Sequence, residues 1–197
     1  MIIVFAKAPV PGKAKTRLVP ALGAWGAARL HERLTRHAVR TALAAGCGRV
    51  EIHGTRRHSF FDSLGLSFRV QRGRDLGERM HHALGRNPGA ILIGTDCPEL
   101  TVADLRRAAR LLRGGYEAVL APAEDGGYAL IALRRVAPEI FRNIAWGTSS
   151  VYEETVKRLA GYRWRALRTV WDVDRPEDLP RLRALRLASA GRRRVRR

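Results

Sequence analysis

Short apolar runs alternate with longer amphipathic segments along the chain. The runs have strand length and are almost wholly apolar, as AILIG at residues 90–94 shows, so they suit a sheet that is covered on both faces. The longer segments repeat their apolar residues at helical spacing. Strands are predicted at residues 2–5, 50–53, 67–70, 90–94, 118–121, 128–133 and 166–170. Helices are predicted at residues 24–44, 76–84, 103–112, 149–159 and 176–187.

This order of elements predicts an α/β protein, namely a three-layer α/β/α sandwich with a mostly parallel sheet. A length of 197 residues fits one domain, which we place at residues 1–190. Residues 191–197 hold five arginines and are predicted to form a disordered basic tail. In such sheets ligands bind beyond the carboxyl ends of the strands, so the chemistry is expected in the loops that follow strands.

The composition is that of an ordinary soluble protein, with 46% apolar and 28% charged residues. No apolar run approaches the roughly 20 residues that a membrane span requires. The N-terminal apolar run is short and follows no basic segment, unlike a secretory signal. Cys47 and Cys97 are isolated, which agrees with a reducing compartment. We therefore expect a cytoplasmic protein without a membrane span.

The net charge of +19 raises the question of a nucleic-acid partner. The chain contains 33 arginines and 4 lysines, and the arginines are scattered over the predicted helices instead of forming one stripe with interleaved aromatic residues. A basic nucleic-acid-binding module is therefore only a distant alternative, and we expect no nucleic acid as partner. The lysines differ from the arginines, because Lys7, Lys13 and Lys15 all lie within the first fifteen residues.

The loop after the first predicted strand, AKAPVPGKAKTRL, carries Lys7, Lys13, Lys15 and Arg17. Four cations in a short loop stiffened by prolines repel one another unless an anion neutralises them, and the phosphates of a nucleotide would do so. An ammonium group follows a phosphate oxygen as a point charge. The segment matches neither the Walker loop nor the dinucleotide-binding glycine motif. A solvated basic surface loop is the alternative interpretation.

Asp96 follows an apolar strand directly, in ILIGTDCPEL. A carboxylate there, facing the same crevice as the basic loop, is placed to hold Mg²⁺ or Mn²⁺ between itself and phosphate oxygens. The alternative is a turn or cap aspartate, but Glu99 or Asp104 can fill that role for the helix that begins near Thr101. Asp96 is therefore a candidate for metal binding and for catalysis.

Two further acidic segments follow strands. In APAEDGGYALIAL, Gly126 and Gly127 permit close approach of the backbone to a nucleotide, with a hairpin turn as an equal alternative; Asp125 is the candidate general base. In WDVDRPEDL, Asp172 and Asp174 are two residues apart and face the same way in an extended chain. One of them can supply a second metal ligand, because a divalent cation on phosphates takes one or two carboxylates.

Six motifs in this order give the chain a resemblance to a family of small bacterial proteins, once grouped as a domain of unknown function and now called arsenosugar-biosynthesis-type glycosyltransferases. The motifs are FAKAPVPGKAKTRL, QRGRDLGERM, GTDCPEL, PAEDGGYALIAL, WGTSSVYEET and DVDRPEDL. The resemblance covers nearly the whole chain and implies the GT-A-like fold of the nucleotide-diphospho-sugar transferase superfamily. It implies nucleotide contacts from Lys13, Lys15 and Arg17, metal binding at Asp96, and a second acidic ligand among Asp172 and Asp174.

The resemblance leaves two reactions open. The basic loop is similar to that of the nucleotidyltransferases that make molybdenum cofactor or the deazaflavin coenzyme, where it grips a triphosphate, whereas the family is assigned glycosyl transfer. We expect a metal-dependent transferase that moves a sugar from a nucleotide sugar to a small-molecule acceptor. Transfer of a nucleotidyl group from an NTP to a phosphorylated small molecule is the alternative.

Overall fold

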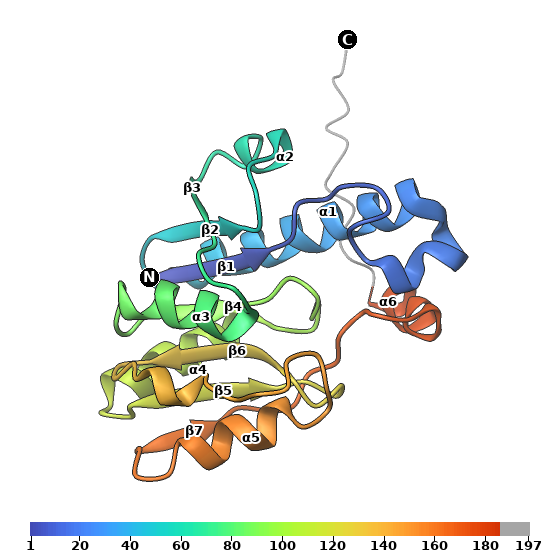
Figure 1. Cartoon of the computed structure of the whole chain (residues 1–197). Coiled ribbons are helices and arrows are strands. Elements are labelled where there is room, and N and C mark those ends of the chain that lie inside the picture. The colour runs from blue at the N-terminus through green and yellow to red at the C-terminus, as the bar shows by residue number, and fades with distance from the viewer. Residues whose placement is uncertain (186–197) are drawn as a thin grey trace.

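The computed structural model describes residues 1–185, in which seven strands form one sheet in the order β3-β2-β1-β4-β6-β5-β7 (Figure 1). Every pairing with β6 is antiparallel and every other pairing is parallel, so β6 alone runs against the other described strands. The strands are β1 (Ile2–Ala6), β2 (Val50–Gly54), β3 (Ser67–Val70), β4 (Ile91–Ile93), β5 (Ala118–Pro122), β6 (Tyr128–Leu133) and β7 (Trp164–Ala166).

Helices cover both faces of this sheet (Figure 1). In that view α3 and α5 lie in front of the strands, and α1 and α4 lie behind them. The α-helices are α1 (Val19–Ala45), α2 (Ser59–Asp62), α3 (Leu76–Gly85), α4 (Val102–Arg113), α5 (Val151–Arg158) and α6 (Leu179–Ala184), with 3-10 turns η1 (Thr16–Leu18), η2 (Pro138–Ile140) and η3 (Pro176–Asp178). The predicted three-layer sandwich with a mostly parallel sheet is confirmed.

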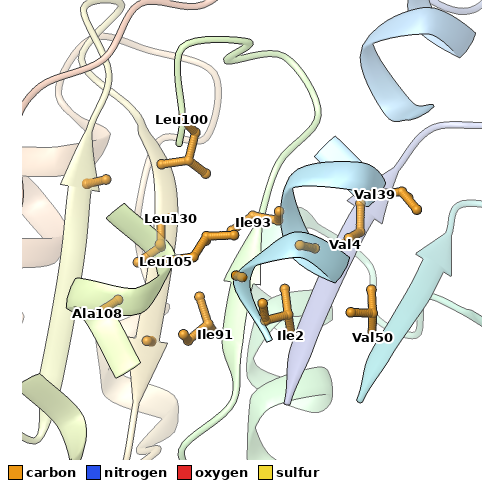
Figure 2. Packing of buried hydrophobic residues seen from close by; sticks show 14 of the residues in the cluster. Ile2, Val4, Val39, Val50, Ile91, Ile93, Leu100, Leu105, Ala108 and Leu130 are labelled. Atoms are coloured by element: carbon orange, nitrogen blue, oxygen red, sulfur yellow. The ribbon is translucent and has the colours of Figure 1, made fainter. Parts of the chain in front are cut away.

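Two apolar clusters hold the three layers together. Successive side chains of a strand point to opposite faces, so Ile2 and Val4 pack toward α1 and α4, while Ile3 and Phe5 pack toward α3. Figure 2 shows the first cluster, in which Val39 of α1 and two residues of α4 meet strand side chains. Burial of each such aliphatic side chain contributes about 1.5–3 kcal/mol.

A third cluster joins segments that are far apart in the sequence. Leu18 of η1, Leu34 of α1 and Leu182 of α6 pack with Trp171 and Val173 of the segment that follows β7. Figure 1 accordingly shows α6 beside the beginning of α1. This cluster places the segment around residues 171–174 against the loop that follows β1.

The last predicted strand was displaced, since β7 ends at Ala166 instead of covering residues 166–170. Residues 168 and 169 leave the sheet because the Arg168 guanidinium donates to Asp104 Oδ2 (3.0 Å) and to the Glu99 carbonyl (2.6 Å). Val170 alone returns, as a bridge to Ala123. The helix predicted at residues 176–187 is split into η3 and α6, because Pro176 and Pro180 each open a new turn.

Two predictions concern residues beyond those that the structure describes. The end of the predicted helix at residue 187 lies outside the described residues, and so does the basic tail predicted at residues 191–197. Within residues 1–185, no helix combines the length and the apolar character that a bilayer span would need.

Candidate functional site

The candidate site lies at the carboxyl ends of β1 and β4, which pair side by side but continue toward opposite edges of the sheet. From β1 the chain runs through α1 to β2, whereas from β4 it runs through α4 to β5, which lies on the other side of β4. Such a switch point opens a crevice at the carboxyl ends of the strands. The loops after β1 and β4 border it, and they carry Lys7–Arg17 and Asp96 respectively.

The loop after β1, residues 7–17, will be called the Lys loop. Its alanines Ala8 and Ala14 are buried and anchor it, whereas Lys7, Lys13 and Arg17 are exposed. Internal hydrogen bonds shape it, since the Lys13 and Ala14 amides donate to the Val10 carbonyl at 2.9 and 3.1 Å. Three of the four cations in this loop are therefore exposed beside the end of β1, as the sequence predicts.

Lys15 is the exception, because it points inward. Its backbone is left-handed (φ 50°, ψ 47°) and its side chain is 3% exposed. The ammonium lies 2.9 Å from Asp96 Oδ1 and donates to the Val173 carbonyl. The Val173 amide in turn donates to the Asp96 carbonyl at 2.8 Å. Lys15 thus ties together the loops after β1, β4 and β7.

Asp96 is held from its buried side and is open on the other. Its side chain is 50% exposed, although Lys15 and His31 beside it are nearly inaccessible. Burial alone would raise the pKa of the Asp96 carboxyl, but the charge of the Lys15 ammonium beside it holds that pKa below its usual range. Asp96 is therefore an anion at neutral pH. It does not cap the helix that follows, because Thr101 and Asp104 form the capping box of α4.

His31 of α1 belongs to this site, and the sequence analysis missed it. Its Nε2 lies 2.9 Å from the Lys7 carbonyl, and its Nδ1 lies 3.9 Å from Asp96 Oδ1. Burial lowers the pKa of the His31 ring, with Asp96 opposing, so the ring is neutral at pH 7. The available signal was its position among Ala27, Ala28 and Leu34 on the apolar face of a predicted helix.

The segment after β7 contributes two carboxylates with different surroundings. Asp174 pairs with Arg17 of the Lys loop, and Asp178 accepts hydrogen bonds from the Asp174 and Arg175 amides at the start of η3. Asp172 forms no ion pair with any residue from 1 to 185. Burial and the nearby charges of Asp125 and Asp174, opposed by Lys15, together raise the pKa of Asp172 to about 6.

The turn between β5 and β6 has the hairpin character that was one of its two interpretations. Asp125 Oδ1 accepts from the Gly127 amide at 2.8 Å. Gly126 has φ +86°, and a Cβ there would lie 2.0 Å from the Ser149 carbonyl oxygen, so close packing against the start of α5 requires glycine. Asp125 is exposed and its charge reaches Asp172 and Cys97.

Cys97 and Trp146 do not add chemistry to this crevice. Burial, then Asp96 and Asp172, raise the pKa of the Cys97 thiol well above its ordinary value, so the thiol stays protonated. Trp146 is half-buried and packs on Gly77, where a Cβ would lie 2.6 Å from its ring. Its contacts are therefore those of a core side chain.

The described residues fit a metal ion only as a partner of ligand phosphates. No group of three or more His, Cys, Asp or Glu side chains within residues 1–185 is arranged to hold an ion alone. Magnesium-type sites commonly use one or two carboxylates together with substrate phosphates and water. Asp96, open on one side, and Asp172, which forms no ion pair within residues 1–185, fit that scheme.

A separate hollow of about 410 Å³ lies at the opposite, amino-terminal edge of the sheet. Its lining includes Met1, Cys47, Arg113 and Arg134, and the Arg134 guanidinium donates to the Leu112 carbonyl at the end of α4. None of the predicted site residues borders it. The convergence of charged groups, and not the size of this hollow, therefore locates the candidate site at the switch point.

The chain belongs to a family described as "Uncharacterized protein conserved in bacteria (DUF2064)", whose profile matches residues 30–148. The resemblance to a family of small bacterial proteins of that kind is thereby confirmed. The matched stretch includes His31, Asp96 and Asp125, and it excludes the Lys loop and Asp172. No curated protein matches the chain.

Solved structures extend the likeness over the whole fold. A candidate nucleotide-diphospho-sugar transferase from Desulfovibrio desulfuricans G20 is 31% identical with a TM-score of 0.84, over 98% of this chain and 89% of that one. CMP:2-keto-3-deoxy-manno-octonic acid synthetase, solved with CTP, is 14% identical with a TM-score of 0.61, over 94% and 97% of the two chains. Rv0371c of Mycobacterium tuberculosis H37Rv, solved with manganese, is 21% identical with a TM-score of 0.57, over 92% and 96%. The last two likenesses concern the fold alone.

Proposed function

We propose that this protein is a metal-dependent transferase of the nucleotide-diphospho-sugar type that moves a sugar from a nucleotide sugar to a small acceptor. One observation carries the proposal: the Lys15–Asp96 ion pair at the switch point is flanked by Lys7 and Lys13, which are exposed and have no acidic partner within residues 1–185. Cations without partners beside an anchored carboxylate suit a phosphate ligand with its counter-ion. The 31% identical structure, a candidate transferase of this type, supports the same class.

Each group has a role in this proposal. Lys7 and Lys13 bind phosphate oxygens from the exposed side of the Lys loop. Lys15 keeps Asp96 ionised and oriented, and Asp96 with Asp172 would hold Mg²⁺ or Mn²⁺. A divalent ion held there would neutralise charge that develops on the departing phosphates. Asp174 is left to orient Arg17, with which it already pairs.

In glycosyl transfer, an acceptor hydroxyl oxygen forms a bond to the anomeric carbon while the bond from that carbon to the β-phosphate oxygen breaks. The nucleoside diphosphate leaves with the electron pair, stabilised by the cationic loop. Asp125 is the proposed base that takes the hydroxyl proton, because it is exposed beside Asp172 at the same edge of the sheet. Gly126 and Gly127 would lie along the nucleotide.

Nucleotidyl transfer is the second candidate, and the charge of the Lys loop favours it. Lys7, Lys13 and Arg17 are all exposed, which suits a triphosphate better than a diphosphate. An oxygen of a phosphorylated acceptor would then attack the α-phosphorus, and pyrophosphate would leave as the bond from the α-phosphorus to the bridging oxygen breaks. Membership of the arsenosugar-biosynthesis type remains part of the first candidate and rests on the six sequence motifs.

Ligand-dependent thermal stability separates the two candidates. We would measure Tm with MnCl2 and each of UDP-glucose, GDP-mannose, UTP, GTP and CTP, and follow release of nucleoside diphosphate or pyrophosphate. A rise in Tm with nucleotide sugars but not with NTPs supports glycosyl transfer, and the reverse supports nucleotidyl transfer. A protein whose Tm responds to none of these ligands, with or without Mn²⁺, would contradict both.

A further inference from the structure

The carbonyl of Lys7 lies just past the end of a strand, where the sheet no longer fixes the backbone. The pairing of β1 with β2 ends at Ala6, whose carbonyl accepts from the Thr55 amide at 3.1 Å. Lys7 is therefore the first residue of the Lys loop whose backbone needs a partner from elsewhere. Its side chain is exposed, so the position of its backbone decides where that ammonium can reach.

The partner is His31, two turns into the regular part of α1. Its Nε2 lies 2.9 Å from the Lys7 carbonyl oxygen. A carbonyl only accepts, so Nε2 must carry the hydrogen, and in the neutral ring Nδ1 is left as a bare acceptor. α1 is a firm base for this bond, because Ala27, Leu30 and Leu34 around His31 are buried in the core.

The orientation of the ring is unfavourable for His31 itself. Nδ1 is buried, has no hydrogen-bond partner, and faces Asp96 Oδ1, another acceptor, at 3.9 Å. A buried polar atom without a partner costs stability, and an apolar side chain at this position would avoid that cost. The ring thus binds the loop through Nε2 while its Nδ1 stays without a hydrogen-bond partner. Such a local cost to stability is typical of functional sites.

From this geometry we infer that His31 is a positioning residue, which sets the Lys loop against Asp96 by holding the Lys7 carbonyl with its Nε2–H. This inference rests on the proposed function in so far as the loop binds nucleotide phosphates. His31 touches no ligand in this role. It acts through the loop, so loss of the ring should weaken nucleotide binding far more than it weakens the fold.

Three variants test this role. His31→Phe keeps the ring volume and removes both nitrogens. His31→Gln restores a donor near the Nε2 position, because the glutamine amide reaches about as far as the imidazole edge. Thr35→Val is the matched control, since Thr35 is fully buried on the same helix and its hydroxyl donates only to the His31 carbonyl within that helix, at 2.9 Å.

The first measurement is binding of the nucleoside diphosphate that the wild type binds best among UDP, GDP and CDP, with MnCl2. We expect His31→Phe to raise Kd at least tenfold, His31→Gln to stay within about threefold of the wild type, and Thr35→Val to leave Kd unchanged. An unchanged Kd in His31→Phe overturns the inference, and so does an equal rise in Thr35→Val.

The second measurement needs no nucleotide. Hydrogen exchange of the Lys13 and Ala14 amides, which donate to Val10, reports the order of the Lys loop. We expect exchange to be several-fold faster in His31→Phe and close to the wild-type rate in His31→Gln and Thr35→Val. If the wild type binds no nucleoside diphosphate, the proposed function fails while exchange still decides whether His31 holds the loop. Faster exchange with unchanged Kd would overturn the positioning role.

Discussion

Lys15 is buried although the cations around it in the Lys loop are exposed. Its left-handed backbone is uncommon for a residue with a side chain, and it turns the ammonium inward to Asp96 and Val173. The sequence analysis grouped Lys15 with Lys7 and Lys13 as a phosphate contact, because nothing in a local pattern reveals one backbone angle or a partner far along the chain. Its contacts make charge compensation of Asp96 its first role.

Replacement of Asp96 is therefore expected to affect the fold as well as metal binding. Asp96→Asn leaves the buried Lys15 ammonium with neutral acceptors and no counter-charge, and should lower the free energy of unfolding by about 1–3 kcal/mol, less than for a fully buried pair because Asp96 is half-exposed. Chemical denaturation measures the change. The double variant Lys15→Met/Asp96→Asn removes both charges and should be more stable than Asp96→Asn alone; equal or lower stability would contradict the pairing.

The exposed lysines should behave differently from Lys15. Lys13→Ala removes a charge without breaking an ion pair within residues 1–185, so Tm should stay within about 1 °C while Kd for a nucleoside diphosphate rises about fivefold, equivalent to about 1 kcal/mol. Lys157→Ala is the control, because Lys157 is an exposed lysine on α5 outside the site. A similar loss of affinity in both variants would mean that only net charge matters.

At the scale of elements, the spacing of the apolar residues was sufficient to predict most of the helices and strands. β6 has the predicted bounds, and α4 and α3 differ from prediction by a residue or so, since each has a clear apolar period and a local cap. β7 was misplaced because Arg168 leaves the sheet to reach Asp104 and Glu99, which local apolar content does not reveal. Asp96 and the Lys loop were found as site candidates because they follow strands, whereas His31 was hidden within a regular helix.

The capping box of α4 gives a prediction for pH. Burial alone would raise the pKa of Asp104, but hydrogen bonds from Thr101 and Arg168 outweigh it and lower that pKa. A lowered folded-state pKa means that Asp104 contributes stability above its unfolded pKa of about 3.9, and that this stability is lost as pH falls through the folded-state value. Asp104→Ala should therefore cost about 1–2 kcal/mol at pH 7.

Denaturant titrations from pH 7 to pH 3 test this expectation. The difference in free energy of unfolding between the wild type and Asp104→Ala should be constant from pH 7 to about pH 5 and should shrink at lower pH. Glu139→Ala serves as control, because Glu139 is 67% exposed and its 3.6 Å pair with Arg142 should contribute almost nothing. A difference for Asp104→Ala that stays constant down to pH 3 would contradict the ionised cap.

At the scale of the whole molecule, the third apolar cluster connects the end of the described chain to the site. Val173 belongs to this cluster, and its backbone amide and carbonyl bind the Asp96 carbonyl and the Lys15 ammonium. Leu182 of α6 packs in the same cluster and Arg181 pairs with Glu124, so α6 holds the segment after β7 against the Lys loop. Packing on α6 is thereby coupled to the geometry of the Lys15–Asp96 pair.

This coupling predicts an effect on binding from a residue that lies outside the site. Leu182→Ala should lower the free energy of unfolding by about 2–5 kcal/mol, and it should also raise Kd for the nucleoside diphosphate, because a loosened Val173 no longer fixes Lys15 and Asp96. Leu84→Ala is the matched control: Leu84 is fully buried in the cluster on the opposite face of the sheet, so it should cost similar stability. Titrations well below both Tm values compare the folded proteins, and α6 is coupled to the site only if Leu182→Ala weakens binding while Leu84→Ala does not.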